Sequence, residues 1–136
     1  MDRVSLCAMS ELVLTATVER ELVALARAAA PREMVAVLGG DGAAVHTVLP
    51  LPNTVGADDA FQVDPIAFAR AERRLRRAGA RFVGFAHSHP RGSALPSARD
   101  RRELWPGCLQ VIVGLGGTAP TVRAFRLERN PEVQPS

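Results

Sequence analysis

Two histidines and an aspartate are spaced so that their side chains could hold a metal ion. His87 and His89 lie two residues apart at the end of an apolar run. On a strand, residues two apart point to the same face, so both imidazoles would converge just beyond the strand end. Pro90 would end that strand because it has no N–H to donate, and the following loop would let Asp100 approach the rings. Two neutral imidazoles and one carboxylate suit a catalytic zinc, with the fourth tetrahedral position left to water.

The same residues also have ordinary structural explanations. Two histidines near a strand end are often surface or packing residues. Ser97 and Asp100 lie three apart after a proline, which matches a helix capping box with Ser97 at the N-cap and Asp100 at N3. A capping box needs no metal, but both interpretations can hold together, because a capping serine is rigidly oriented at a helix start. The combination of all four residues at these spacings favours the metal site.

The segment His87-Ser88-His89-Pro90, followed by Ser97 and Asp100, resembles the H-x-H-P, S-x-x-D signature of the JAMM (MPN-plus) metalloproteases. That family also has a glutamate on an earlier strand, preceded by a proline and followed by an apolar run that ends in glycine. Glu33 within residues 31–40 fits this description. Ala36 stands where such sequences often have glycine, which is a mild departure. Taken alone, Glu33 has the alternative explanation of a surface acid at the start of a strand or helix.

The resemblance covers about residues 12–127 and includes further short motifs. These motifs are Pro52-Asn53, Val63-Asp64-Pro65 and Trp105-Pro106-Gly107. The fold that the resemblance implies is α/β: a mixed sheet flanked by helices in three layers, related in architecture to the zinc-dependent cytidine deaminases. The order of strands and helices along the chain argues independently for a mixed sheet with helices packed on it.

The resemblance also implies a reaction, the zinc-dependent hydrolysis of a peptide or isopeptide bond. His87, His89 and Asp100 would hold Zn²⁺, which lowers the pKa of a bound water to about 7. Glu33 would act as the general base, and Ser97 would donate a hydrogen bond to the oxyanion of the tetrahedral intermediate. The implied substrate bond follows the C-terminal tail of a ubiquitin-like protein. The compact chain favours a stand-alone prokaryotic-type member acting on a small ubiquitin-like or sulfur-carrier protein.

Periodicity and turn residues predict the elements that must position these side chains. A helix from Pro65 would start at an Asp64 N-cap and end before Gly79. A loose lead-in is expected over about residues 1–11 and a frayed tail from about residue 129. The predicted strands are 12–18, 33–38, 43–49, 81–87, 110–115 and 122–127, and the predicted helices are 19–30, 65–78 and 97–104.

Length and composition fit one globular domain over residues 1–136, with 47% hydrophobic residues and a formal net charge of +3. All 17 basic residues are arginine, so the chain has no lysine that could carry an isopeptide linkage. Cys7 and Cys108 are too few and too scattered for a disulfide framework. The first residues lack the apolar run of a signal peptide, and no apolar run reaches the ~20 residues of a membrane helix. We therefore expect a cytoplasmic protein without membrane contact, and leave its oligomeric state open.

Two alternatives belong to other functional classes. The first is a non-catalytic MPN-type scaffold, which the presence of all five motif residues counts against. The second is a nucleic-acid-associated protein that uses the arginines of the helix 65–78. Basic charge alone supplies only salt-dependent, non-specific binding, and arginines near a helix C-terminus also complement the helix dipole. We therefore favour a solvated helix face, with nucleic acid as an unlikely partner.

Overall fold

The computed structural model describes residues 4–8, 13–55, 61–104 and 107–129. In chain order, the elements are β1 (Val4–Ala8), β2 (Val13–Leu14), α1 (Ala16–Ala29), β3 (Val35–Gly40), β4 (Ala44–Leu51), α2 (Pro65–Arg77), β5 (Arg81–His89), α3 (Ala98–Glu103), β6 (Leu109–Gly114) and β7 (Thr121–Arg129). None of these helices is long and apolar enough to cross a membrane.

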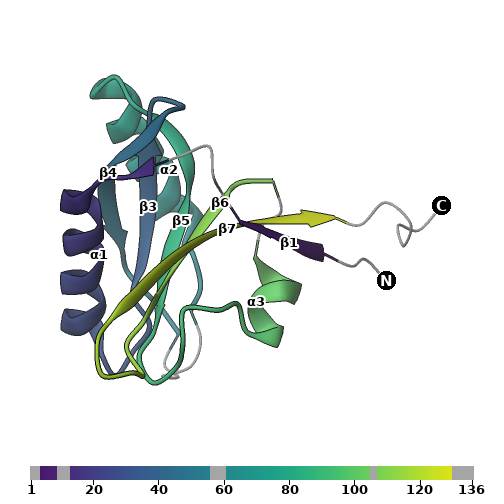
Figure 1. Cartoon of the computed structure of the whole chain (residues 1–136). Helices are drawn as coiled ribbons and strands as arrows, with labels where there is room; N and C mark the ends of the chain where they lie inside the picture. Colours follow the sequence, from purple (N-terminus) through teal and green to yellow (C-terminus); the bar gives the residue numbers. More distant parts are fainter. Residues whose placement is uncertain (1–3, 9–12, 56–60, 105–106, 130–136) are drawn as a thin grey trace.

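Within these described ranges the strands form one seven-stranded sheet in the order β1-β7-β6-β5-β3-β4-β2 (Figure 1). The pairs β5–β6 and β2–β4 are parallel, and the other neighbours are antiparallel. The sheet is therefore mixed, as predicted. β5 lies between β3 and β6, so the strand that carries the two histidines is paired on both sides.

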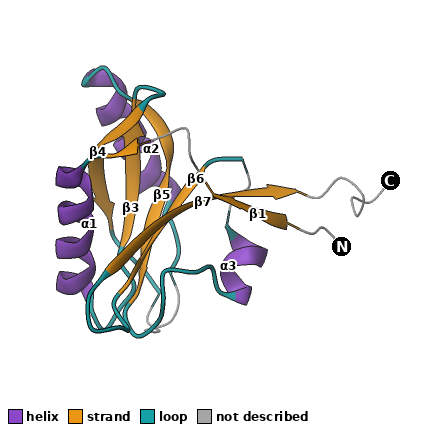
Figure 2. Ribbon diagram, viewed as in Figure 1, coloured by secondary structure: helices purple, strands orange, loops and turns teal. Residues whose placement is uncertain are grey.

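Helices cover both faces of this sheet (Figure 2). On one face, α1 buries an apolar stripe that includes Val18 and Leu22 against the sheet. On the other face, α2 buries Leu75 together with Val35 and Phe85. α3 lies on the α2 side, because its Asp100 contacts His87, a residue that pairs in register with Val35. The predicted three-layer arrangement of a mixed sheet flanked by helices is confirmed.

The beginning of the chain differs from the prediction in two places. Val4–Ala8 is not a loose lead-in but an edge strand that pairs with β7, a partner more than 110 residues away that no local pattern reveals. The predicted strand over 12–18 is reduced to Val13–Leu14. Thr15 accepts a hydrogen bond from the backbone N–H of Val18 and caps α1, so the helix starts three residues earlier than predicted.

Glycines allow close packing at the end of β3, beyond residue 38, where the strand was predicted to end. The strand continues through Gly39 and Gly40. A Cβ on Gly39 would lie 2.4 Å from Cδ2 of Leu75, and one on Gly40 would lie 2.2 Å from the carbonyl oxygen of Ala44. The two glycines therefore bring α2 and β4 against the strand, and the turn follows them.

The predicted end of α2 is confirmed, because Gly79 follows it with a φ of +79°. β5 extends two residues beyond its predicted end, to His89, and Pro90 follows it. β7 likewise extends to Arg129. The predicted tail and the Trp105-Pro106 motif lie outside the described residues.

Candidate active site

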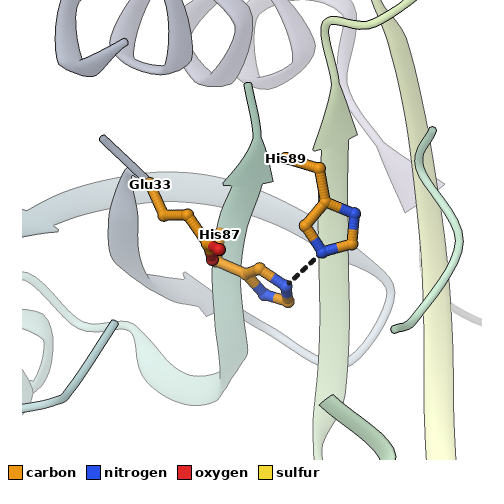
Figure 3. A group of neighbouring side chains, drawn as sticks. All are labelled: Glu33, His87 and His89. Atoms are coloured by element: carbon orange, nitrogen blue, oxygen red, sulfur yellow. Dashed lines mark hydrogen bonds between the residues drawn. The ribbon is translucent and has the colours of Figure 1, made fainter. Parts of the chain in front are cut away.

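The two histidines converge at the end of β5, as their spacing predicts. His87 is completely buried and pairs in register with Val35 on β3 and Ile112 on β6. The Nε2 atoms of His87 and His89 lie 3.2 Å apart (Figure 3). Because neutral imidazole nitrogens placed this close need a proton or a cation between them, the pair is a natural place for a metal ion.

Asp100 completes the cluster from the start of α3. Its Oδ2 atom lies 3.2 Å from Nε2 of His87 and 2.9 Å from Nε2 of His89. The same oxygen accepts a hydrogen bond from the backbone N–H of Ser97, while Oγ of Ser97 accepts one from the backbone N–H of Asp100. The capping box is therefore present, and it holds the carboxylate against both imidazoles.

The spacing of these three atoms fits a small tetrahedral ion. For zinc bonds of about 2.0–2.1 Å, neighbouring ligand atoms in a tetrahedron lie about 3.3 Å apart. The three observed distances are 3.2, 3.2 and 2.9 Å. Nδ1 of His89 lies 2.8 Å from the carbonyl oxygen of Ser93. A ring that donates from Nδ1 keeps the lone pair of Nε2 for the metal.

The protonation states also suit a metal site. Burial lowers the pKa of His87 below its ordinary value, because a charged ring is disfavoured away from water. The lowered pKa favours the neutral ring that a metal requires. Burial alone would raise the pKa of Asp100, but hydrogen bonds with His87 and His89 hold it well below its ordinary range. Burial also opposes a charge on His89, but the hydrogen bonds with Asp100 and Ser93 outweigh it and raise the pKa. An incoming cation would therefore compete with a proton mainly at His89.

Glu33 lies just before β3 and points toward the histidines (Figure 3). Only 6% of the residue is exposed. One of its carboxylate oxygens and ring nitrogens of His87 and His89 all lie within 4.8 Å of one another. Glu33 and Asp100 therefore approach the two histidines from different elements, so the five residues predicted from the sequence gather in one place.

A hollow of about 450 Å³ opens beside this cluster. Glu33, His89 and Ser97 line it, together with residues 90–92 and Pro31. A glutamate, a histidine and a serine from three different elements or loops thus line the same space.

Two positioning residues were not recognised from the sequence pattern. Ser88, between the histidines, is fully buried; its Oγ accepts a hydrogen bond of 2.7 Å from the backbone N–H of Met34. This bond fixes the chain next to Glu33. Phe61 stacks on the ring of His87, with centroids 4.7 Å apart and an interplanar angle of 29°. A polar residue inside an apolar strand is a usable signal for Ser88, whereas nothing in the sequence pairs Phe61 with His87.

A glycine-rich turn supports the loop that follows the histidines. The backbone N–H of Leu115 donates to the carbonyl of His89, and that of Gly116 donates to the carbonyl of Gly92. A Cβ on Gly114 would lie 2.5 Å from the nitrogen of Ala94 and 2.6 Å from the carbonyl carbon of Ser93. The missing side chain of Gly114 therefore sets the position of the carbonyl that orients His89.

Gly114→Ala should consequently weaken the binding of a metal ion, tested here with zinc, without changing any of the three ligand-type residues. The added methyl group would push the Ser93 carbonyl away from His89, and loss of such a partner lowers metal affinity by about 10–100-fold. Gly117→Ala is the matched control, because its Cβ would lie at an ordinary 3.6 Å from the nearest atom, the carbonyl oxygen of Ala119. Competition with a chromogenic chelator measures both affinities. Equal zinc affinity in the two variants would contradict this role for Gly114.

Comparison with known proteins identifies the family. The sequence model of the prokaryotic homologues of the JAB domain matches residues 15–128. The chain belongs to this family, and the predicted resemblance to a stand-alone prokaryotic JAMM-type protein is confirmed.

Two curated relatives are similar in sequence. A probable TtuB-protein conjugate cleaving protease from Thermus thermophilus is 40% identical over 105 residues, covering 76% of this chain and 68% of the relative. A desampylase from Haloferax volcanii is 36% identical over 91 residues, covering 64% of this chain and 66% of the relative. The chain thus spans about two thirds of the length of each relative.

Solved structures share the fold. The solution structure of a protein from Desulfitobacterium hafniense is 32% identical, with a TM-score of 0.76, and the match covers 88% of this chain and 89% of that one. The crystal structure of a JAB1/MPN domain protein from Archaeoglobus fulgidus is 20% identical, with a TM-score of 0.53 and coverage of 90% and 95%. The second likeness concerns the fold alone.

Proposed function

We propose that this protein is a zinc-dependent isopeptidase that cleaves the bond following the C-terminal tail of a ubiquitin-like or sulfur-carrier protein. The observation that carries the proposal is the convergence of three ligand-type atoms, from His87, His89 and Asp100, beside the buried carboxylate of Glu33. The names of the two curated relatives, a conjugate-cleaving protease and a desampylase, support hydrolysis of protein conjugates.

His87, His89 and Asp100 would hold the zinc, and Glu33 would serve as the general base. Both carboxylates reach the histidines, and Asp100 places one oxygen at ligand spacing from both Nε2 atoms. Asp100 is also fixed by the capping box, whereas Glu33 lines the open hollow where a water and a substrate can enter. These differences support a ligand role for Asp100 and a proton-transfer role for Glu33.

Zinc, when bound, would lower the pKa of a bound water to about 7 and polarise the scissile carbonyl. Glu33 would take the proton of the attacking water and give it to the leaving amine. Oγ of Ser97 already accepts a hydrogen bond from Asp100, so its own O–H is available to donate to the oxyanion of the tetrahedral intermediate. His87 is completely buried, so bulk water does not compete with a metal ion for its ring nitrogen.

A panel of fusion substrates tests this proposal. Each fusion joins a small ubiquitin-like or sulfur-carrier protein to a reporter through its C-terminal tail. We expect cleavage at the end of the tail by the zinc-loaded protein, loss of cleavage after chelation, and recovery when zinc is returned. Retention of a fusion on the protein without cleavage would instead indicate the non-catalytic MPN-type scaffold. Cleavage that is unaffected by chelation would contradict the proposed chemistry.

A further inference from the structure

We propose that Asn53 is a positioning residue for this reaction. Its side chain holds the backbone of Glu33, the proposed general base, and also the backbone next to Phe61, whose ring stacks on His87. The inference rests on the proposed function, because it assigns Asn53 a part in placing Glu33. Asn53 follows β4 at the start of the connection to α2.

The amide nitrogen of Asn53 holds the segment that carries Glu33. Its Nδ2 donates a hydrogen bond of 3.0 Å to the backbone carbonyl of Glu33. From the other side, Oγ of Ser88 accepts from the backbone N–H of Met34, the next residue. In the peptide unit between Glu33 and Met34, the C=O is thus hydrogen-bonded to Asn53 and the N–H to Ser88. Because Ser88 lies between the two histidines, this pair of hydrogen bonds fixes the base relative to the ligands.

The amide oxygen of Asn53 holds a second segment. Oδ1 accepts from the backbone N–H of Val55 at 3.1 Å and, with a longer bond of 3.4 Å, from that of Gln62. Gln62 immediately follows Phe61, whose ring stacks on His87. The side-chain amide of Asn53 therefore connects the segment just before β3, which carries Glu33, with the segment that carries Phe61, the residue that stacks on His87.

A neighbouring arginine strengthens the same junction. The guanidinium of Arg32 donates to the backbone carbonyls of Asn53 and Val55. Arg32 precedes Glu33 directly, so both residues at this point of the chain bond to the segment 53–55. Loss of the Asn53 side chain would leave Arg32 in place and release only the contacts of the amide, which makes the asparagine separable by mutation.

The consequence for catalysis is geometric. A general base must lie within hydrogen-bond reach of the proton that it takes, and a displacement of about 1 Å can cost about 10²-fold in rate. Asn53 contacts the main chain of Glu33 rather than its carboxylate, so it would affect where the base lies and not its chemical identity. We therefore expect a fall in kcat with little change in KM or in zinc affinity.

Two substitutions separate the two halves of the amide. Asn53→Ala removes both, whereas Asn53→Asp keeps the acceptors for Val55 and Gln62 but loses the donor to Glu33. Thr54→Ala, at the exposed next position, is the matched control. Four quantities are measured for each protein: kcat and KM on the cleaved fusion, zinc affinity, and amide hydrogen exchange at Val55 and Gln62 by NMR.

We expect kcat to fall about 10–100-fold in both Asn53 variants, with KM and zinc affinity within about threefold of the original protein. Exchange at Val55 and Gln62 should accelerate in Asn53→Ala and stay slow in Asn53→Asp, while Thr54→Ala leaves all four quantities unchanged. A kcat within twofold of the original in either variant would overturn the role in placing Glu33. Unchanged hydrogen exchange in Asn53→Ala would overturn the role of Asn53 in holding the backbone at Val55 and Gln62.

The same measurements distinguish failure of this inference from failure of the proposed function. An original protein that cleaves no fusion, or a Glu33→Ala variant that cleaves as fast as the original, refutes the proposed function, and the catalytic role of Asn53 falls with it. The hydrogen-exchange measurement needs no substrate, and it still decides whether Asn53 holds the backbone at Val55 and Gln62. Full activity of the original protein together with full activity of Asn53→Ala refutes the inference alone.

Discussion

Replacement of Glu33 by alanine should abolish turnover and leave zinc bound. General-base catalysis contributes about 10²–10⁴-fold to rate, and no other carboxylate among the described residues lines the hollow beside His89. His87, His89 and Asp100 keep their mutual contacts without Glu33, so the ligand set is preserved. The measurement is kcat on a cleaved fusion, with zinc content of the same preparation determined by mass spectrometry.

Glu21→Ala is the matched control, since Glu21 is an exposed glutamate in the middle of α1. It should retain full activity. Retained activity in Glu33→Ala would remove this residue from the mechanism. Loss of zinc together with activity would mean that Glu33 is itself a ligand, and the assignments of Glu33 and Asp100 would then have to be exchanged.

His89→Ala should release the metal altogether. The purified original protein is expected to contain about one zinc per chain, held by three protein ligands. Removal of one imidazole leaves two ligands, and it also leaves Oδ2 of Asp100 without the shorter of its two histidine contacts. We expect zinc content near zero and no cleavage in this variant. Inductively coupled plasma mass spectrometry of the untagged protein measures the zinc content directly.

His46→Ala controls for the general loss of a histidine, because His46 is exposed on β4 and bonds only to its neighbour Thr47 among the described contacts. Its zinc content should equal that of the original protein. An unchanged zinc content in His89→Ala, or no zinc in any of the three proteins after zinc is supplied, would show that the histidines are structural. The protein would then be a binding module.

The parts of the site that lie close together in the sequence could be predicted from it. Two histidines two apart on a strand share a face by geometry alone, and the short loop after Pro90 returns Asp100 to them. Glu33 was different: its role came from a family resemblance, because no local pattern connects it with residues more than 50 positions away. The fold class followed from the order of the elements, which the structure confirms.

Several of the missed features depend on tertiary contacts. β1 pairs with β7, at the other end of the chain, and Phe61 stacks on His87, which lies 26 positions further along the sequence. The contacts of Asn53 join segments 20 residues apart through backbone groups, which side-chain patterns do not report. Gly39 and Gly40 misled the prediction because glycine signals both turns and close packing, and here it serves the second purpose.

The hydrogen bond between Met34 and Ser88 has a consequence for how the active enzyme comes into being. The ligand-type residues are at most 13 positions apart, whereas this bond spans 54. Closing a longer loop costs more chain entropy, and contacts distant in sequence tend to slow folding. A partly folded chain could therefore assemble the metal centre before the base is in place. Such an intermediate would carry zinc without being able to hydrolyse, so the newly made protein would become a protease only when β3 has paired with β5.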